Sequence, residues 1–355
     1  MAWIGLNDKH VHWFKARGQS PSVSSGWLVR GSIVVETRMS ADARPQTLLA
    51  FARNYPEKGR FSLQALPRGG LVMVDAAGDE IVHATLPYVA DGRLDALLLT
   101  YSWDLDTNWA RLTLQRPETD ELHSVELTAP IAMRLEELNA AIGLGCDCET
   151  DEEVSFVAVS DAIEPVGPMP ALTSRVPIHT PTGTKEAGRV CRGDRVLTNE
   201  GKAVPVLQVI KRTVPARGSF RPVRLRAPYF GLRQDIVLGP QQRLVMSGSQ
   251  VEYLFGREAV LVPARHLVND RSAFLARGPD LVTYYHLLLP GHEVIMAAGC
   301  PIESLYLGRL RRKPEAIAAS LLAPCDRSRL PEHPKPVWPV LKPFEAVTLA
   351  MTRAA

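Results

Sequence analysis

The chain has 355 residues, 46% apolar and 22% charged, so it is long enough for two domains that each bury a core. A net charge of +3 excludes a strongly polyanion-seeking protein. The 28 prolines and 25 glycines favour many short strands and turns over a helical bundle.

The two halves of the chain differ in charge. Residues 1–164 contain 14 Lys and Arg against 24 Asp and Glu, whereas residues 165–355 contain 27 against 14. The change coincides with acidic residues 147–153 and with the proline run 164–170, a composition typical of an exposed linker. We therefore predict a first domain over 1–145, a linker over 146–170, a second domain over 171–308 and a basic, proline-rich tail over 309–355.

The first half is dominated by short runs rich in Val, Ile, Leu and Thr, separated by turn sequences. About eight such strands at regular spacing predict an all-β sandwich or jelly roll. One amphipathic helix is expected at 130–141, with proline as its first residue. The predicted strands lie within 26–40, 47–53, 60–66, 70–75, 80–87, 93–104, 108–115 and 123–128.

The second half is also rich in predicted strands, including the run VEYLF at 251–255. The tail predicts a short helix, a polyproline-like arm and a final short apolar segment. No apolar run reaches the ~18 residues of a membrane span. The first eighteen residues contain no apolar stretch of the Sec type, and five cysteines are an odd, sparse set. We therefore expect a cytoplasmic location, with export by a route without an N-terminal signal left open.

Strand-like runs in the first half resemble the laminin-G/concanavalin A-like jelly roll. The similarity covers roughly residues 25–145 and lies in SIVVETRMS, TLLAFAR, GRFSLQALPRGGLVMV, LTYSWD and NWARLTLQ. It implies a concanavalin A-like sandwich, a fold often used to bind glycans or protein surfaces. A fold alone does not establish a function.

Four ordered blocks in the second half resemble the Hint (Hedgehog/intein) domain in its bacterial variety. These are HTPTGTKEAGRVCRGDRVLTNEG, LRAPYFGLRQDIVLGPQQRLV, VEYLFGREAVLVPARHLVND and VTYYHLLLPGHEVIMAAGCPIESLYLG. The resemblance implies a Hint-type β fold over about 171–308. It also implies a self-cleaving chemistry, in which a leading Cys or Ser attacks the preceding carbonyl and a histidine protonates the departing nitrogen.

The positions that the resemblance assigns to this chemistry have lost their reactive groups. Counting back seven residues from Ile178 places the family's leading nucleophile at Ala171. The family's block histidine falls at Gln242, and its terminal His-Asn pair falls at 303–304, which is Glu-Ser here. Two late histidines remain, His286 and His292, either as a residual acid/base pair or as histidines bonded at strand edges.

Other side chains offer substitutes for the lost nucleophile. Thr173 and Ser174 would serve if the register slipped, and Cys300 lies in the late block, although a buried, inert thiol is the alternative reading. Cys191 reads as a packing residue. We therefore predict an inactive, degenerate autoprocessing domain and leave open an active one that uses a substitute nucleophile.

The remaining motifs predict neither a metal site nor a cofactor. Cys146 and Cys148 form a single C-x-C, with His10 and His12 as distant partners, whereas zinc sites usually show two pairs. The acidic turn with Asp104 and Asp106 reads as solvent-facing rather than calcium-binding. The basic segment 211–234 alternates with apolar residues as a half-buried strand does, so no nucleic-acid binding is expected. The expected partner is a glycan or a protein bound by the sandwich, and a purely structural protein without a ligand is the alternative.

Overall fold

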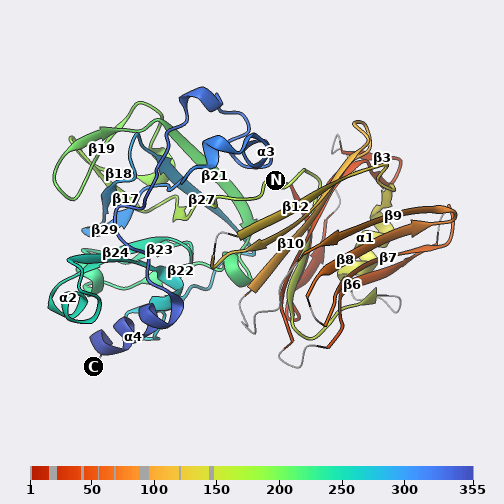
Figure 1. The fold of residues 1–355 in the computed structure, drawn as a ribbon, viewed down its shortest axis with the longest axis horizontal. Helices are drawn as coiled ribbons and strands as arrows, with labels where there is room; N and C mark the ends of the chain where they lie inside the picture. Colours follow the sequence, from red (N-terminus) through yellow and green to blue (C-terminus); the bar gives the residue numbers. More distant parts are fainter. Residues whose placement is uncertain are drawn as a thin grey trace. The chain divides into compact units, whose positions relative to one another are not determined.

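The computed structural model describes residues 2–15, 22–40, 44–54, 56–67, 69–87, 96–119, 121–143 and 148–354. The chain divides into two compact units (Figure 1). The first comprises Met1–Val166 with Arg217–Ser219, and the second comprises Gly167–Ala216 with Phe220–Ala355. Within the described ranges, no helix is long and apolar enough to cross a membrane.

The first unit is an antiparallel β-sandwich. A seven-stranded sheet has the order β12-β11-β10-β5-β15-β1-β2, and a five-stranded sheet has the order β14-β6-β7-β8-β9. A small third sheet, β13-β4-β3, lies alongside helix α1. The elements are β1 (Trp3–Asn7), β2 (His12–Phe14), β3 (Val23–Ser24), β4 (Trp27–Leu28), β5 (Arg30–Arg38), β6 (Gln46–Arg53), β7 (Gly59–Ala65), β8 (Leu71–Ala77), β9 (Glu80–Leu86), β10 (Ala96–Asp104), β11 (Trp109–Arg116), β12 (Glu121–Thr128), β13 (Met133–Arg134), α1 (Leu135–Gly143), β14 (Cys148–Glu149) and β15 (Val154–Ser160).

Apolar side chains from both large sheets form one core. Phe61 of β7 lies 5.8 Å from Tyr101 of β10 between ring centroids, so aromatic contacts join the two sheets. A buried ion pair lies within the five-stranded sheet, where Arg53 of β6 and Asp75 of β8 approach to 2.8 Å with side chains 2% and 0% exposed. The predicted all-β class and the eight predicted strands are confirmed.

Two predictions for the first half differ from the structure. Helix α1 begins at Leu135 rather than Pro130, because Met133 and Arg134 pair with β4 first. The segment 146–170 is not an extended linker throughout. Within it, β15 pairs with both β5 and β1, and Val157 and Val159 are buried in the core. The acidic residues before VSFVAVS concealed an alternation that is typical of a core strand.

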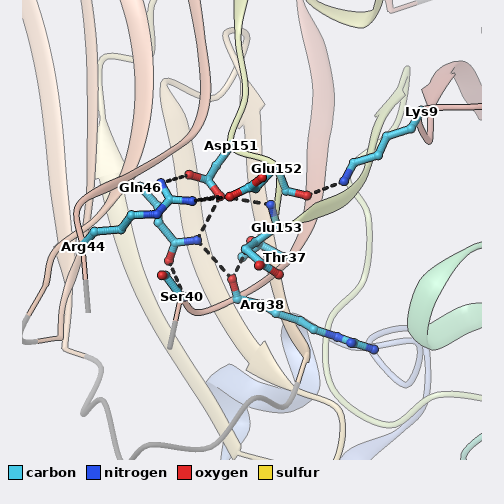
Figure 2. Close-up of polar contacts among 9 residues, drawn as sticks. All are labelled: Lys9, Thr37, Arg38, Ser40, Arg44, Gln46, Asp151, Glu152 and Glu153. Atoms are coloured by element: carbon cyan, nitrogen blue, oxygen red, sulfur yellow. Dashed lines mark hydrogen bonds and ion pairs between the residues drawn. The ribbon is translucent and has the colours of Figure 1, made fainter. Parts of the chain in front are cut away.

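Polar contacts hold the acidic residues against the sandwich (Figure 2). Asp151 accepts hydrogen bonds from Arg44 at 2.5 and 3.2 Å, from Gln46 at 3.2 Å and from the Glu153 N–H at 3.0 Å. Burial raises the pKa of this carboxyl, but these hydrogen bonds outweigh burial and hold the pKa below its ordinary value. The Asp151 N–H also donates to the Thr47 carbonyl, so this stretch belongs to the first unit.

The second unit contains two six-stranded antiparallel sheets, β21-β27-β16-β23-β22-β26 and β18-β17-β28-β29-β24-β25, and the pair β19-β20. Its strands are β16 (Leu172–Thr173), β17 (Pro177–Thr180), β18 (Gly183–Glu186), β19 (Arg195–Leu197), β20 (Ala203–Pro205), β21 (Gln208–Pro215), β22 (Val223–Leu225), β23 (Ile236–Leu238), β24 (Arg243–Ser247), β25 (Ala259–Pro263), β26 (Ala273–Leu275), β27 (Leu281–Leu288), β28 (Val294–Ala297) and β29 (Cys300–Glu303). Its helices and helical turns are η1 (Ala187–Arg189), η2 (Gly218–Phe220), η3 (Tyr229–Gly231), α2 (Ser249–Phe255), η4 (Ala264–Leu267), η5 (Leu310–Arg312), α3 (Pro314–Ala318), η6 (Arg327–Arg329) and α4 (Pro343–Ala354).

The run VEYLF forms helix α2 and not the strand that its apolar residues predicted. Glycines bound this helix, and Gly256 ends it with a φ of 60°, the left-handed conformation that glycine adopts readily. Val251 is the buried side chain of the helix, while Tyr253 is 89% exposed. A short apolar run does not by itself distinguish a strand from a helix.

The tail folds back onto the second unit. Ile317 and Leu330 pack into a small core with Leu305 and Leu307. Leu341 joins the main core of the unit, as do two residues of α4. The predicted short helix is present as α3, and the final apolar segment is helical rather than extended.

Candidate functional site

Ala171 lies immediately before β16, and its backbone bonds to residues on both sides. Its N–H donates to the Tyr285 carbonyl at 3.3 Å, and its carbonyl accepts from the Gly239 N–H at 2.6 Å. The residue is 2% exposed. A Cβ at Gly239 would lie 3.0 Å from Cα of Ala171, so glycine permits this close approach. The position predicted for the nucleophile therefore holds a buried methyl group on a hydrogen-bonded backbone.

Gln242 is completely buried at the turn before β24. Its Nε2 donates to the Glu303 carbonyl at 3.1 Å and to the Arg243 carbonyl at 3.3 Å. Its Oε1 has no hydrogen-bond partner among the described residues. The amide group is therefore fixed through its nitrogen, and it has no proton that it can release at neutral pH.

Glu303 and His292 lie side by side next to Gln242. The Nε2 of His292 lies 3.2 Å from Oε2 of Glu303, although poorly aligned for a hydrogen bond, and Arg243 lies 3.4 Å from the same carboxylate oxygen. The Nδ1 of His292 accepts the Val337 N–H at 3.0 Å. Because Nδ1 accepts, the proton of the neutral ring resides on Nε2 and faces Glu303.

The next residue, Ser304, also has a structural role. It is fully buried, and its hydroxyl accepts the Glu293 N–H at 3.0 Å. The Ser304 N–H in turn donates to the Glu293 carbonyl at 2.9 Å. The two residues at the position of the family's terminal pair therefore hold β-strand ends together.

His286 lies on β27, and neither ring nitrogen has a hydrogen-bond partner in the described part of the chain. Burial lowers its pKa to about 4, against the opposing effects of the Glu303 carboxylate and carbonyl and the Met169 carbonyl. The ring is therefore neutral near pH 7. Among the described residues, its ring makes no strand-edge hydrogen bond, which was the alternative offered by the sequence.

The predicted substitute nucleophiles are hydrogen-bonded, exposed on a turn or buried. The Thr173 hydroxyl donates to the Val237 carbonyl at 2.7 Å. Ser174 is exposed on the turn after β16, where its carbonyl accepts the Gly188 N–H. Cys300 is 1% exposed at the start of β29, and burial raises the pKa of its thiol to about 12. None of these three has an activating base among its hydrogen-bond partners in the described residues.

The other predicted cysteines and histidines form no metal-binding cluster among the described residues. Cys146 is outside the described residues, and the Cys148 thiol donates to the Ala141 carbonyl at 3.3 Å. His10 and His12 are exposed, and Cys191 is exposed rather than packed. No group of three His, Cys, Asp or Glu side chains suited to a metal ion occurs among the residues that the structure describes.

The acidic turn and the basic segment show local pairing. The Asp104 carboxylate accepts the Asp106 N–H at 3.1 Å, closing a turn on itself. In β22, Val223 and Leu225 are buried whereas Arg224 is exposed and bonded to Asp235 at 2.7 Å. This is the alternation of a half-buried strand, as expected.

Sequence reasoning missed His333. This residue lies in the tail, is 2% exposed, and accepts the Leu307 N–H at its Nδ1 at 3.3 Å. Its ring centroid lies 6.0 Å from that of His292, and Tyr306 lies 4.9 Å from His292. Nothing in the predicted blocks includes the tail, so only the structure brings this third imidazole to the cluster.

A comparison with family models agrees with the resemblance drawn for the second half of the sequence. Residues 170–309 match the family model described as the Hint domain. A search of curated proteins finds no match. The chain is similar in structure to the carbohydrate-binding module CBM40 of the Ruminococcus gnavus IT-sialidase bound to α2,3-sialyllactose, with 15% identity, a TM-score of 0.28, and coverage of 37% of this chain and 75% of that one.

Two inteins are also similar in structure. For the MchDnaB-1 intein the identity is 18%, the TM-score 0.26 and the coverage 37% of this chain and 98% of that one. For the gp41-1 intein the values are 16%, 0.25, 38% and 98%. TM-scores and identities this low establish neither an activity nor a ligand. Residues 170–309 of this chain carry the sequence pattern of a Hint domain.

Proposed function

We propose that the second unit is a Hint-type module without self-cleaving activity, in a chain whose first unit supplies a binding surface. The observation that carries this proposal is the pair of substitutions at Ala171 and Gln242. A methyl group cannot attack the preceding carbonyl, and a glutamine cannot protonate a departing amide nitrogen. The buried surroundings of both residues support the same conclusion.

The remaining imidazoles do not replace the lost groups. The His286 ring is neutral and makes no hydrogen bond to a hydroxyl or thiol in the described residues. Both nitrogens of the neutral His292 ring face specific groups, Val337 and Glu303. A general base acts only within hydrogen-bond reach of the proton that it removes, and neither ring has a nucleophile there.

The alternative is an active protein that uses Thr173, Ser174 or Cys300. Incubation of the full chain with thiol or hydroxylamine, followed by electrophoresis, tests both readings, because these reagents release a fragment from any (thio)ester that forms. We expect one full-length band. Two fragments joined near residue 170 would refute the proposal, and the variants Thr173→Val, Ser174→Ala and Cys300→Ala would then identify the nucleophile.

We further propose that the sandwich binds a glycan or protein on the outer face of its five-stranded sheet. Ser62, Val74 and His83 are paired across β7, β8 and β9, and Gln64 and Thr85 lie in the next row. Their side chains are exposed or half-buried, so this face offers hydrogen-bonding groups to a polyhydroxyl ligand. The CBM40 neighbour is described as bound to sialyllactose, which makes sialylated glycans the first to test.

A glycan array probed with the full chain tests this second proposal. We expect binding that decreases in His83→Ala and Gln64→Ala, and the matched control is Glu80→Ala at the edge of β9. A role for this face would be refuted by two results together. The chain would bind no glycan on the array, and the variants would bind any protein partner as well as the natural chain does.

A further inference from the structure

The segment Pro331–Leu341, which we call the strap, crosses the second unit beyond the residues that match the Hint family. Leu330 at one end is buried in the small core, and Leu341 at the other end is buried in the main core. Near its C-terminal end, the strap pairs with the edge strand β25, where the Leu261 N–H donates to the Pro339 carbonyl and the Leu341 N–H donates to the Leu261 carbonyl. Four prolines lie between these ends, and proline disfavours a helix there.

Two histidines hold the middle of the strap in a reciprocal way. His292, in the body of the unit, accepts the N–H of Val337 in the strap at 3.0 Å. His333, in the strap, accepts the N–H of Leu307 in the body at 3.3 Å. In both contacts Nδ1 is the acceptor and a backbone N–H is the donor, so both rings must be unprotonated at Nδ1.

We propose that the strap is a latch that opens on acidification, because protonation of His292 and His333 converts both Nδ1 acceptors into donors. A protonated imidazole carries N–H on both nitrogens, and each Nδ1–H would then face another N–H. Protonation therefore breaks both Nδ1 hydrogen bonds by the same chemical event, while the hydrogen bond from the His333 N–H to the Gly308 carbonyl at 3.0 Å and the ion pair of Glu332 with Arg312 remain.

The groups that surround His292 and His333 disfavour a positive charge on both rings at the same time. His292 faces Glu303 of β29, with Arg243 of β24 on the same carboxylate, and His286 of β27 lies near enough to interact electrostatically with both. His333 faces His292, Tyr306 and the carbonyls of Leu289 and Pro290. The Glu303 carboxylate therefore interacts with two imidazoles, His286 and His292, and with the guanidinium of Arg243.

Burial of His333 also favours its neutral form. It lowers the pKa of His333, and the neighbouring His292 lowers it further, against the effect of the two carbonyls. The neutral ring is therefore the folded form near pH 7. The neutral His333 ring keeps the latch closed there, and its lowered pKa means that protonation needs a lower pH than an ordinary histidine requires.

Hydrogen exchange of the full chain, measured by mass spectrometry at about pH 7.5 and about pH 5 and corrected for intrinsic rates, tests the latch. Peptides that cover Glu332–Trp338, and the peptide that contains Leu307, are expected to exchange on the order of tenfold faster at the lower pH. Peptides from β24 and β27 are expected to stay more protected than the strap at both values. Equal protection of the strap at both values, or its loss together with β24 and β27, would overturn the proposal.

Two double variants distinguish the role of the Nδ1 hydrogen-bond acceptor from the role of the positive charge that the imidazole gains. Asparagine places a carbonyl oxygen near the position of Nδ1 and does not titrate, so the double variant His292→Asn/His333→Asn should keep the strap protected at both pH values. The double variant His292→Phe/His333→Phe keeps aromatic bulk without the acceptor and should expose the strap at both. A strap that still opens on acidification in the asparagine variant contradicts a histidine latch.

Discussion

Replacement of His286 by leucine should remove much of the acid sensitivity of the second unit. The ring is 4% exposed, and its nitrogens find no hydrogen-bond partner among the described residues. Burial lowers its pKa from the ordinary 6.5 to about 4. As the pH falls below about 6.5, the unfolded chain takes up a proton at this residue while the folded chain does not, so the free energy of unfolding decreases.

The size of this effect follows from the pKa difference. One pKa unit corresponds to about 1.4 kcal/mol, so the lowering to about 4 removes roughly 3 kcal/mol between pH 6.5 and pH 4. The variant His286→Leu should lose that pH dependence. At pH 7 it should remain within about 1 kcal/mol of the natural chain, since the substitution also removes two buried nitrogens without partners.

Urea unfolding at a series of pH values, followed by circular dichroism and fitted for the second unit's transition, measures this difference. The matched control is His179→Leu on β17 of the same unit, which should retain the acid sensitivity of the natural chain. Parallel pH profiles for the natural chain and His286→Leu would show that the buried imidazole is not the acid-sensitive group, and the reasoning would fail.

Three further predictions concern the core of the first unit and the lost reaction of the second. The variant Val157→Ala should lower the free energy of unfolding of the first unit by about 2 kcal/mol in chemical denaturation, because β15 is a core strand; no change would restore the linker reading. The variant Asp75→Asn should cost about 3–5 kcal/mol by leaving Arg53 unpaired, whereas Arg53→Met/Asp75→Leu should recover most of that loss in the same assay. The double variant Ala171→Cys/Gln242→His should release a fragment at residue 170 in hydroxylamine, detected by mass spectrometry, because it returns a nucleophile and a proton donor; an intact variant would mean that the scaffold has also lost the reaction geometry.

Much of the fold could be predicted where the pattern of apolar residues was regular. The ends of strands β6 to β12 lie within three residues of the ends of the predicted runs, because alternating side chains must face one core. The prediction was wrong for β15, where acidic neighbours outweighed the strand pattern, and for α2, where glycines at both ends favoured a helix. Both segments are short, and in short segments the surrounding tertiary structure decides.

The candidate site was predictable as far as the sequence blocks extend. The spacing of those blocks indicated Ala171 and Gln242, and the structure places Gln242 against Glu303, which the same blocks assigned to the terminal pair. His333 could not be predicted, because it reaches the cluster from a proline-rich tail that resembles a solvated arm. Its position depends on Leu330 and Leu341 packing into the two cores of the unit, a tertiary effect that no local pattern signals.

The most direct test of an inactive Hint-type module is the intact mass of the purified full chain after prolonged incubation with hydroxylamine at neutral pH. With Ala171 and Gln242 in place, we predict a single species of 39.0 kDa, unchanged from the start of the incubation. Two fragments that join between Pro170 and Ala171 would contradict the account, because they require a nucleophile and a proton donor that the proposal holds to be lost.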